Sequence, residues 1–144
     1  MLEYRTAQKQ DVDYLLWLRK QTMTTYLQQA GIPTTDAFHL QRIQYQFAHA
    51  QLILWEGELV GLLKMIKKEG DWEIAQFQIA PDFQGKGIGQ QVLKIVPEAA
   101  KDKDALVRLS VLKQNPARRL YEKVGFQHTH EDQHSYYLEF RSGI

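Results

Sequence analysis

Residues 84–89 constrain the fold of this chain more than any other stretch, because three glycines alternate within them. An apolar run ends just before them at Ala80, and an amphipathic helical pattern begins directly after them. The sequence therefore predicts a strand, a glycine loop and a helix, in that order. Glycines lack the Cβ atom that would hold an anion away from the backbone, and the unpaired N–H groups at a helix start attract negative charge. This order is typical of a phosphate-binding loop.

Two widespread phosphate loops fit this stretch poorly. The P-loop of nucleotide triphosphatases requires G-x-x-x-x-G-K-[ST], which occurs nowhere in the sequence. The dinucleotide fingerprint requires G-x-G-x-x-G, whereas Gly85, Gly87 and Gly89 give G-x-G-x-G. Gln90 then stands where the third glycine belongs. A glycine-rich turn that precedes a helix and binds nothing is the simplest alternative.

A third kind of loop fits without a mismatch. Gln84, Gly87 and Gly89 match Q/R-x-x-G-x-G/A, the pyrophosphate loop of the GNAT N-acetyltransferase superfamily. Residues 115–126 read NPARRLYEKVGF, which resembles the second GNAT signature, N-x-x-A-x-x-x-Y-x-x-x-G-F, shortened by one residue before the alanine. Because both motifs occur in the right order, the chain resembles a bacterial-type, single-domain GNAT protein, most strongly over residues 72–128.

Composition narrows the class of protein further. A chain of 144 residues is long enough for one domain with a proper core, so we expect a single GNAT acetyltransferase domain over residues 1–144. The net charge of +1 gives no electrostatic reason to expect nucleic acid or an anionic membrane as a partner. No apolar run is long enough to span a bilayer, and the N-terminus does not read as a signal peptide. Cysteine is absent, which excludes disulfides, thiolate metal sites and a cysteine nucleophile. We expect a cytoplasmic protein without a metal.

Hydrophobic periodicity and turn residues predict the elements. Helices are expected at residues 11–29, 36–50, 87–100 and 115–124, and strands at 2–5, 52–55, 59–66, 72–80, 106–112, 126–130 and 135–140. Pro97 should end or kink the third helix near Val96. These patterns alone support a mixed α/β (α+β) fold. The resemblance implies the GNAT fold, a mixed, mostly antiparallel, twisted sheet of about seven strands flanked by four helices in the order βααβββαβαββ.

The same resemblance implies transfer of an acetyl group from acetyl-coenzyme A (acetyl-CoA) to an amine by direct attack, without a covalent intermediate on the protein. The pyrophosphate of the donor would lie against the backbone of Gln84, Gly85, Lys86, Gly87, Ile88 and Gly89. Its pantetheine arm would pair with the backbone of Phe77, Gln78 and Ile79, and one of these amides would polarise the thioester carbonyl. Asn115 would cap the helix after it and contact the pantetheine arm.

Two side chains are candidates for the proton transfers. Tyr121 matches the tyrosine of the second motif, which would protonate the leaving thiolate. The alternative is a tyrosine that only packs beside Ala117. Glu73 matches the glutamate that acts as the base in histone-acetylating members of the superfamily. A solvated carboxylate at the edge of a strand is an open alternative, since many relatives use a chain of waters.

In this fold the first two helices and the last hairpin border the acceptor. Here they carry aromatic residues and few acidic ones, which favours a small amine, an amino acid derivative or a peptide amine over a polyamine. His39 and His49 lie on the expected second helix and need no special role, and His128 and His130 could share one face of a strand. A non-catalytic acyl-CoA sensor and a nucleotide-binding module unrelated to coenzyme A are alternative functions. Both a monomer and a homodimer are compatible with the sequence.

Overall fold

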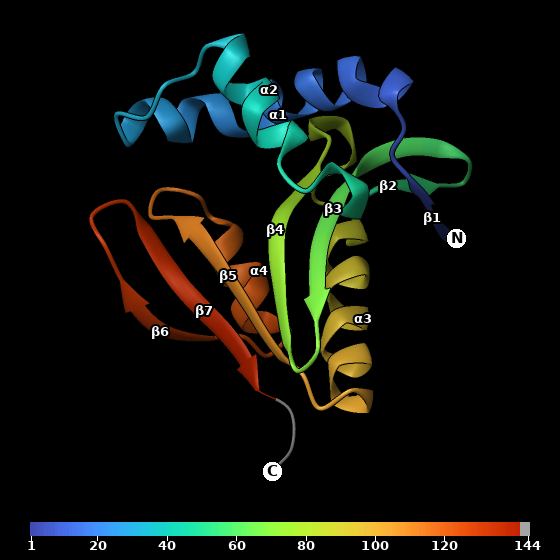
Figure 1. Ribbon diagram of the computed structural model, residues 1–144, viewed down its shortest axis with the longest axis vertical. Coiled ribbons are helices and arrows are strands. Elements are labelled where there is room, and N and C mark those ends of the chain that lie inside the picture. Colours follow the sequence, from blue (N-terminus) through green and yellow to red (C-terminus); the bar gives the residue numbers. More distant parts are fainter. Residues whose placement is uncertain (142–144) are drawn as a thin grey trace. The chain divides into compact units, whose positions relative to one another are not determined.

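The computed structural model describes residues 1–141, and Figure 1 shows its elements. In chain order they are β1 (Leu2–Thr6), α1 (Val12–Gln29), α2 (Asp36–Gln44), β2 (Ala50–Trp55), β3 (Glu58–Lys68), β4 (Asp71–Ile79), α3 (Ile88–Asp102), β5 (Leu106–Leu112), α4 (Ala117–Lys123), β6 (Gln127–Glu131) and β7 (Ser135–Arg141). The predicted order βααβββαβαββ is therefore confirmed.

The strands hydrogen-bond in the order β1-β2-β3-β4-β5-β7-β6. The pairs β1/β2, β2/β3, β5/β7 and β6/β7 are antiparallel, whereas β4 and β5 pair in parallel over Asp71–Glu73. The predicted mixed, mostly antiparallel sheet of seven strands with four helices is thus confirmed. By its internal contacts the described chain divides into two compact units. The first holds Met1–Met65 and Gln76–Gln84, and the second holds Ile66–Ala75 and the described residues from Gly85 onward.

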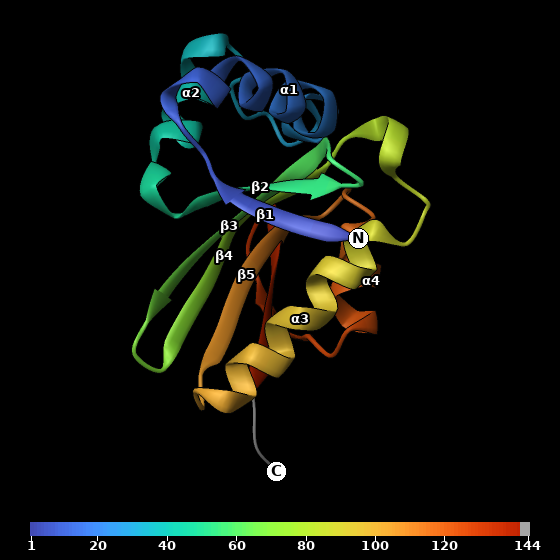
Figure 2. The same ribbon diagram turned by 90° about the vertical axis from the view of Figure 1, so that its right-hand side faces the viewer.

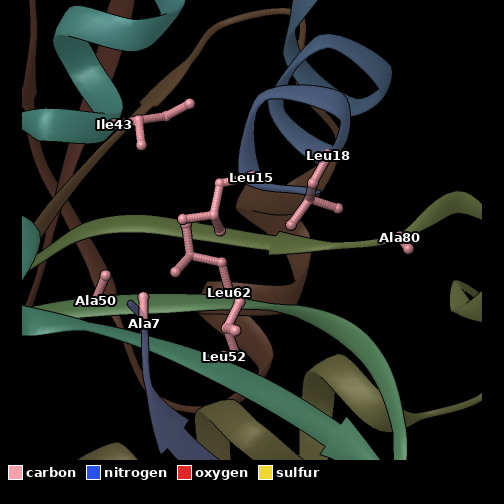
Figure 3. Close-up of a cluster of buried hydrophobic side chains, with 8 residues drawn as sticks. All are labelled: Ala7, Leu15, Leu18, Ile43, Ala50, Leu52, Leu62 and Ala80. Carbon is pink, nitrogen blue, oxygen red and sulfur yellow. The ribbon is translucent and has the colours of Figure 1, made fainter. Parts of the chain in front are cut away.

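The first unit is held together by a small apolar core beneath its two helices, shown in Figure 3. Leu15 and Leu18 of α1 point toward Leu52 and Leu62 of the sheet, while Ile43 reaches the same cluster from α2. Each of these side chains is almost fully buried. Burying an aliphatic side chain contributes roughly 1.5–3 kcal/mol. This cluster therefore fixes both helices to the strands of the unit.

Within the first unit, β3 approaches β4 very closely at Gly61. A Cβ atom on Gly61 would lie 2.3 Å from the carbonyl oxygen of Gln78, a distance that real Cβ atoms do not show. Just beyond, the Ala80 N–H donates to the Val60 carbonyl at 2.8 Å. Only glycine allows this approach, so Gly61 sets the position of the Gln78 carbonyl.

In the second unit, α3 buries one side and lies beside α4 (Figure 2). Val92, Leu93, Val96 and Ala100 are all almost fully buried. Pro97 is expected to end or kink this helix near Val96. It does not end the helix, because α3 runs through Pro97 to Asp102. Pro97 is itself buried. We attribute the continuity of α3 to burial of this face, which offsets a proline penalty of about 3 kcal/mol.

The second helix is shorter than its sequence pattern predicts. It ends at Gln44, because Tyr45 leaves helical geometry at ψ 119° and Gln46 is left-handed at φ 51°. The side chain of Lys64 caps the end of the helix. Its ammonium donates to the carbonyls of Arg42, Ile43 and Tyr45 at 3.1, 3.0 and 2.5 Å. A side chain distant in sequence therefore stops α2, and local periodicity could not reveal it. None of the helices in residues 1–141 combines the length and the apolar character needed to cross a bilayer.

Candidate functional site

The glycine loop opens α3, as predicted. Gly87 is the residue before the first turn and has φ 82°, and Gly85 has φ 76°, a left-handed conformation that favours glycine at both positions. A Cβ atom on either residue would meet no atom within 4 Å. The loop is therefore open above its backbone. Ile88 and Gly89 lie in the first turn of α3, where the N–H groups have no acceptor within the helix. Such a turn suits an anion.

The first residue of the loop belongs to the other unit and has a defined partner there. The side-chain amide of Gln84 donates to the carbonyl of Ile79 at 2.8 Å. This bond ties the start of the loop to the end of β4. Lys86, in the middle of the loop, is exposed.

The predicted pantetheine strand is the last part of β4. Gln78 and Ile79 are buried, whereas Phe77 is half-buried. The close approach of Gly61 holds the Gln78 carbonyl. The Gln78 backbone therefore packs directly against β3.

Tyr121 is a buried residue of α4, with 6% of its surface exposed. Its ring meets Phe126 edge-on, with the ring centres 5.9 Å apart. Burial raises the pKa of the Tyr121 phenol, so the side chain stays protonated at neutral pH. Asn115 caps the same segment, since its Oδ1 accepts a hydrogen bond from the Ala117 N–H at 2.9 Å. Helix α4 starts two residues later than expected, at Ala117.

Glu73 lines a cavity of about 110 Å³ in the second unit. The lining comes from β4, β5, β6 and β7: Glu73, Arg108, Leu109, Ser110, Thr129, His130, Tyr137, Leu138 and Glu139. Arg108 binds Asp71 through two hydrogen bonds of 2.8 and 3.0 Å. That bond raises the pKa of Arg108, and Glu73 and Glu139 raise it by smaller amounts. The cavity thus combines two carboxylates with an arginine that is already paired. Glu139 is paired as well, with Arg141 at 3.2 Å, which leaves Glu73 as the carboxylate that could face an amine. Tyr121 is not among its lining residues.

The last hairpin places its histidines on opposite faces. The register of β6 and β7 shifts between His128 and His130, so that His128 lies opposite Leu138 while His130 lies opposite Tyr137. The expectation of a shared face is therefore wrong, because the irregularity at Thr129 breaks the alternation. His130 stacks on Tyr137 with ring centres 4.4 Å apart. Among residues 1–141, no group of three or more acidic, histidine or cysteine side chains is placed to hold a metal ion.

The first unit also contains a group of basic side chains that the sequence analysis did not identify. We call Arg19, His39, Arg42 and Lys64 the basic cluster. Arg19 and Lys64 are 6% and 1% exposed, and Arg19 Nε donates to His39 Nδ1 at 3.1 Å. Burial, with Arg42 as the smaller cause, lowers the pKa of Arg19 to about 10. Burial, followed by the charges of Arg42 and Arg19, lowers the pKa of Lys64 to about 8. These residues come from α1, α2 and β3, so only the fold brings them together.

Comparison with known proteins identifies the family of the chain. Residues 23–141 match the acetyltransferase (GNAT) domain family. A Bacillus subtilis (strain 168) protein, provisionally named ribosomal protein bS18-alanine N-acetyltransferase, is 27% identical over 126 residues, which cover 85% of this chain and 79% of that protein.

Two solved structures share the fold. The PaiA N-acetyltransferase of Thermoplasma acidophilum in complex with coenzyme A has a TM-score of 0.74 at 18% identity, covering 98% of this chain and 99% of that one. The ribosomal-protein-S18-alanine N-acetyltransferase of Escherichia coli has a TM-score of 0.73 at 12% identity, covering 100% and 96%.

Proposed function

The chain belongs to the GNAT acetyltransferase family, and from this premise we propose that it transfers an acetyl group from acetyl-CoA to a primary amine of a small molecule or peptide. The observation that carries the proposal is the open glycine loop at the start of α3, which presents backbone N–H groups where a pyrophosphate would bind. In this proposal residues 1–144 form one domain, the protein works in the cytoplasm, and the reaction needs no metal.

In this proposal different segments bind different parts of acetyl-CoA. The backbone from Gln84 to Gly89 holds the pyrophosphate, and Lys86 adds a positive charge beside it. The backbone of Phe77, Gln78 and Ile79 pairs with the pantetheine arm, and Asn115 contacts that arm while capping α4. One amide of the strand donates to the carbonyl oxygen of the thioester. An oxyanion donor of this kind typically contributes about 3–4 kcal/mol to the reaction barrier.

The reaction itself is a direct transfer. Glu73, directly or through a water, takes a proton from the acceptor ammonium, and the free amine attacks the thioester carbon. The C–N bond forms, the C–S bond breaks, and Tyr121 gives its proton to the departing sulfur. The cavity that Glu73 lines supports an amine as the acceptor. The name of the Bacillus relative adds an alanine of a ribosomal protein to the acceptors worth testing.

A calorimetric titration with acetyl-CoA tests the donor site. We expect the wild-type protein to bind acetyl-CoA and the Gly87→Glu variant to lose binding, because a glutamate there brings both a negative charge and a side chain at φ 82°. Gly57→Glu is a matched control, since Gly57 has the same φ of 82° in the turn between β2 and β3, outside the glycine loop, and the variant should keep binding. Equal binding by wild type and Gly87→Glu would remove the loop from the donor site. If the wild type bound no acetyl-CoA, the proposed function would fail as well.

A further inference from the structure

The basic cluster holds more positive charge than its surroundings balance. No hydrogen bond or ion pair joins Arg19, His39, Arg42 or Lys64 to a carboxylate within residues 1–141. The acidic side chain that acts most strongly on His39 is Asp36, and it is exposed and pairs with Lys20 at 2.8 Å. Buried charges in proteins are normally paired, because leaving water without a partner is strongly unfavourable.

The local structure explains Lys64 but not Arg19. The Lys64 ammonium uses its donors on the three carbonyls at the end of α2. A guanidinium carries five N–H donors, and Arg19 uses one of them, on His39. No other hydrogen bond to the Arg19 side chain occurs among the described residues. An arginine that is 6% exposed and largely unpaired needs a further partner.

His39 and Gln76 leave further polar atoms unpaired beside Arg19 and Arg42. Since Arg19 is the donor, His39 Nδ1 is the acceptor, and the neutral ring therefore carries its proton on Nε2. That Nε2 is buried without a partner among the described residues. Gln76 donates its amide to the Arg42 carbonyl, while its own Oε1 is buried and unpaired. Unsatisfied polar groups of the first unit therefore come from three elements: Arg19 from α1, His39 from α2 and Gln76 from β4.

The basic cluster is also tied to the predicted acyl-binding strand. Gln76 joins the end of α2 to β4, and Phe77, Gln78 and Ile79 follow it directly along the chain. All of these residues belong to the first unit. Gln76 therefore links the helix that carries His39 and Arg42 to the strand that is proposed to hold the thioester.

We propose that the basic cluster binds a carboxylate of the acceptor, so that the amine this protein acetylates is a free amino acid or a small amino acid derivative that keeps its carboxylate. This inference rests on the proposed acetyl transfer. Arg19 supplies N–H groups in the planar fork that fits a carboxylate, and Arg42 adds a second cation. Both are specificity-determining residues and take no part in proton transfer.

The test compares acids with their matched amides. The full-length protein is given acetyl-CoA and either a common L-amino acid, β-alanine or γ-aminobutyrate, or the carboxamide of the same compound, and thiol release is followed. We expect kcat/KM for at least one acid to exceed that of its carboxamide by about 10- to 100-fold, the size of a charge-assisted hydrogen bond. The difference should appear mainly in KM.

Variants separate recognition from folding. Arg19→Gln and the less buried Arg42→Gln should each bring the ratio of acid to carboxamide close to one, while Lys20→Gln, which removes a neighbouring cation outside the cluster, should keep the wild-type ratio. A variant that lowers acid and carboxamide equally would indicate a purely structural arginine and overturn the inference. Thermal unfolding of each variant identifies loss of the fold.

The inference and the proposed function fail in distinguishable ways. Turnover of carboxamides with no preference for any acid would overturn the carboxylate site and leave acetyl transfer standing. If no amine releases thiol, N-acetyl amino acids and N-acetyl amino acid amides are titrated in the presence of coenzyme A. Acid binding at least about 10-fold tighter, lost in Arg19→Gln, would support the carboxylate site without catalysis. Equal or absent binding would overturn it.

Discussion

Burial of Tyr121 raises the pKa of its phenol and so determines how readily it can donate a proton. A phenol with a raised pKa is fully protonated at neutral pH, yet it gives up its proton less readily than an exposed tyrosine. The same poorly solvated surroundings also disfavour a free thiolate. Proton donation during cleavage of the C–S bond relieves the sulfur of its charge, and this makes a buried tyrosine a reasonable acid despite its pKa.

Removing the Tyr121 hydroxyl should therefore affect turnover and not donor binding. We expect Tyr121→Phe to lower kcat by roughly 10² to 10⁴, the usual contribution of a positioned general acid. The phenylalanine keeps the contact with Phe126, so the affinity for acetyl-CoA should change little. Tyr4→Phe, in β1, is the matched control. Wild-type turnover in Tyr121→Phe would leave the residue with a packing role only.

At the level of single residues, the sequence predicts the parts of the candidate site that lie in short motifs and misses those that only the fold brings together. The glycine loop, Asn115 and Tyr121 could be proposed as site residues because each belongs to a short motif with local spacing. Arg19, His39, Arg42 and Lys64 could not, because a cation in a sequence is normally a solvated one. Their burial depends on how α1 and α2 pack on the strands.

At the scale of the elements, the helix boundary that the sequence predicts least well is the end of α2, expected at residue 50 and found at Gln44. Helix α3 begins within one residue of its expected start, since the glycine loop is a local signal. The end of α2 depends on Lys64, and the persistence of α3 past Pro97 depends on the buried face of that helix. The direction in which the β6 side chains point depends on an irregularity at Thr129, and no glycine or proline in the sequence predicts it. In each case the observed structure differs from the one that the local sequence pattern predicts.

The pairing of β3 with β4 gives a prediction for the element that holds the donor. Gly61→Ala should destabilise the protein by about 1–3 kcal/mol, as overpacked sites do. It should also weaken acetyl-CoA binding, because the new Cβ displaces the Gln78 carbonyl. Gly31→Ala is a useful control: its φ of 72° brings strain, but a Cβ there meets no atom within 4 Å. The unfolding midpoints of the two variants measure the loss of stability, and calorimetric Kd values measure the affinity for acetyl-CoA. Unaltered donor affinity in Gly61→Ala would contradict the role of this backbone segment.

At the scale of the whole molecule, the basic cluster makes stability depend on pH. Lys64 has a folded pKa of about 8, below its ordinary 10.5, so the folded state disfavours its charged form. Between these values the unfolded chain binds the proton and the folded chain does not, and the free energy of unfolding therefore rises with pH. Above pH 10 the buried tyrosines oppose this trend, because burial raises the pKa of Tyr14 to about 12.

We expect the free energy of unfolding to rise by about 1–3 kcal/mol between pH 8 and pH 10 and to fall at higher pH. Chemical denaturation across this range measures it. The rise is smaller than the full pKa difference implies, because the window from pH 8 to pH 10 covers only part of that difference. Lys64→Met should be less stable at every pH and should lose the rise. A rise that persists in Lys64→Met would assign it to another group.

The way in which Lys64 closes α2 also bears on the chemical lifetime of the protein. A protein that handles acetyl thioesters exposes its own amines to them, and Lys64 in an unfolded chain is as open to acetylation as any other lysine. With 1% of its surface exposed, Lys64 is shielded once the chain has folded. Acetylation of a nascent chain would leave one N–H for three carbonyls and no charge, so the end of α2 would lose its cap. Folding before exposure to the donor thus protects this enzyme from stray modification by the compound it is proposed to use.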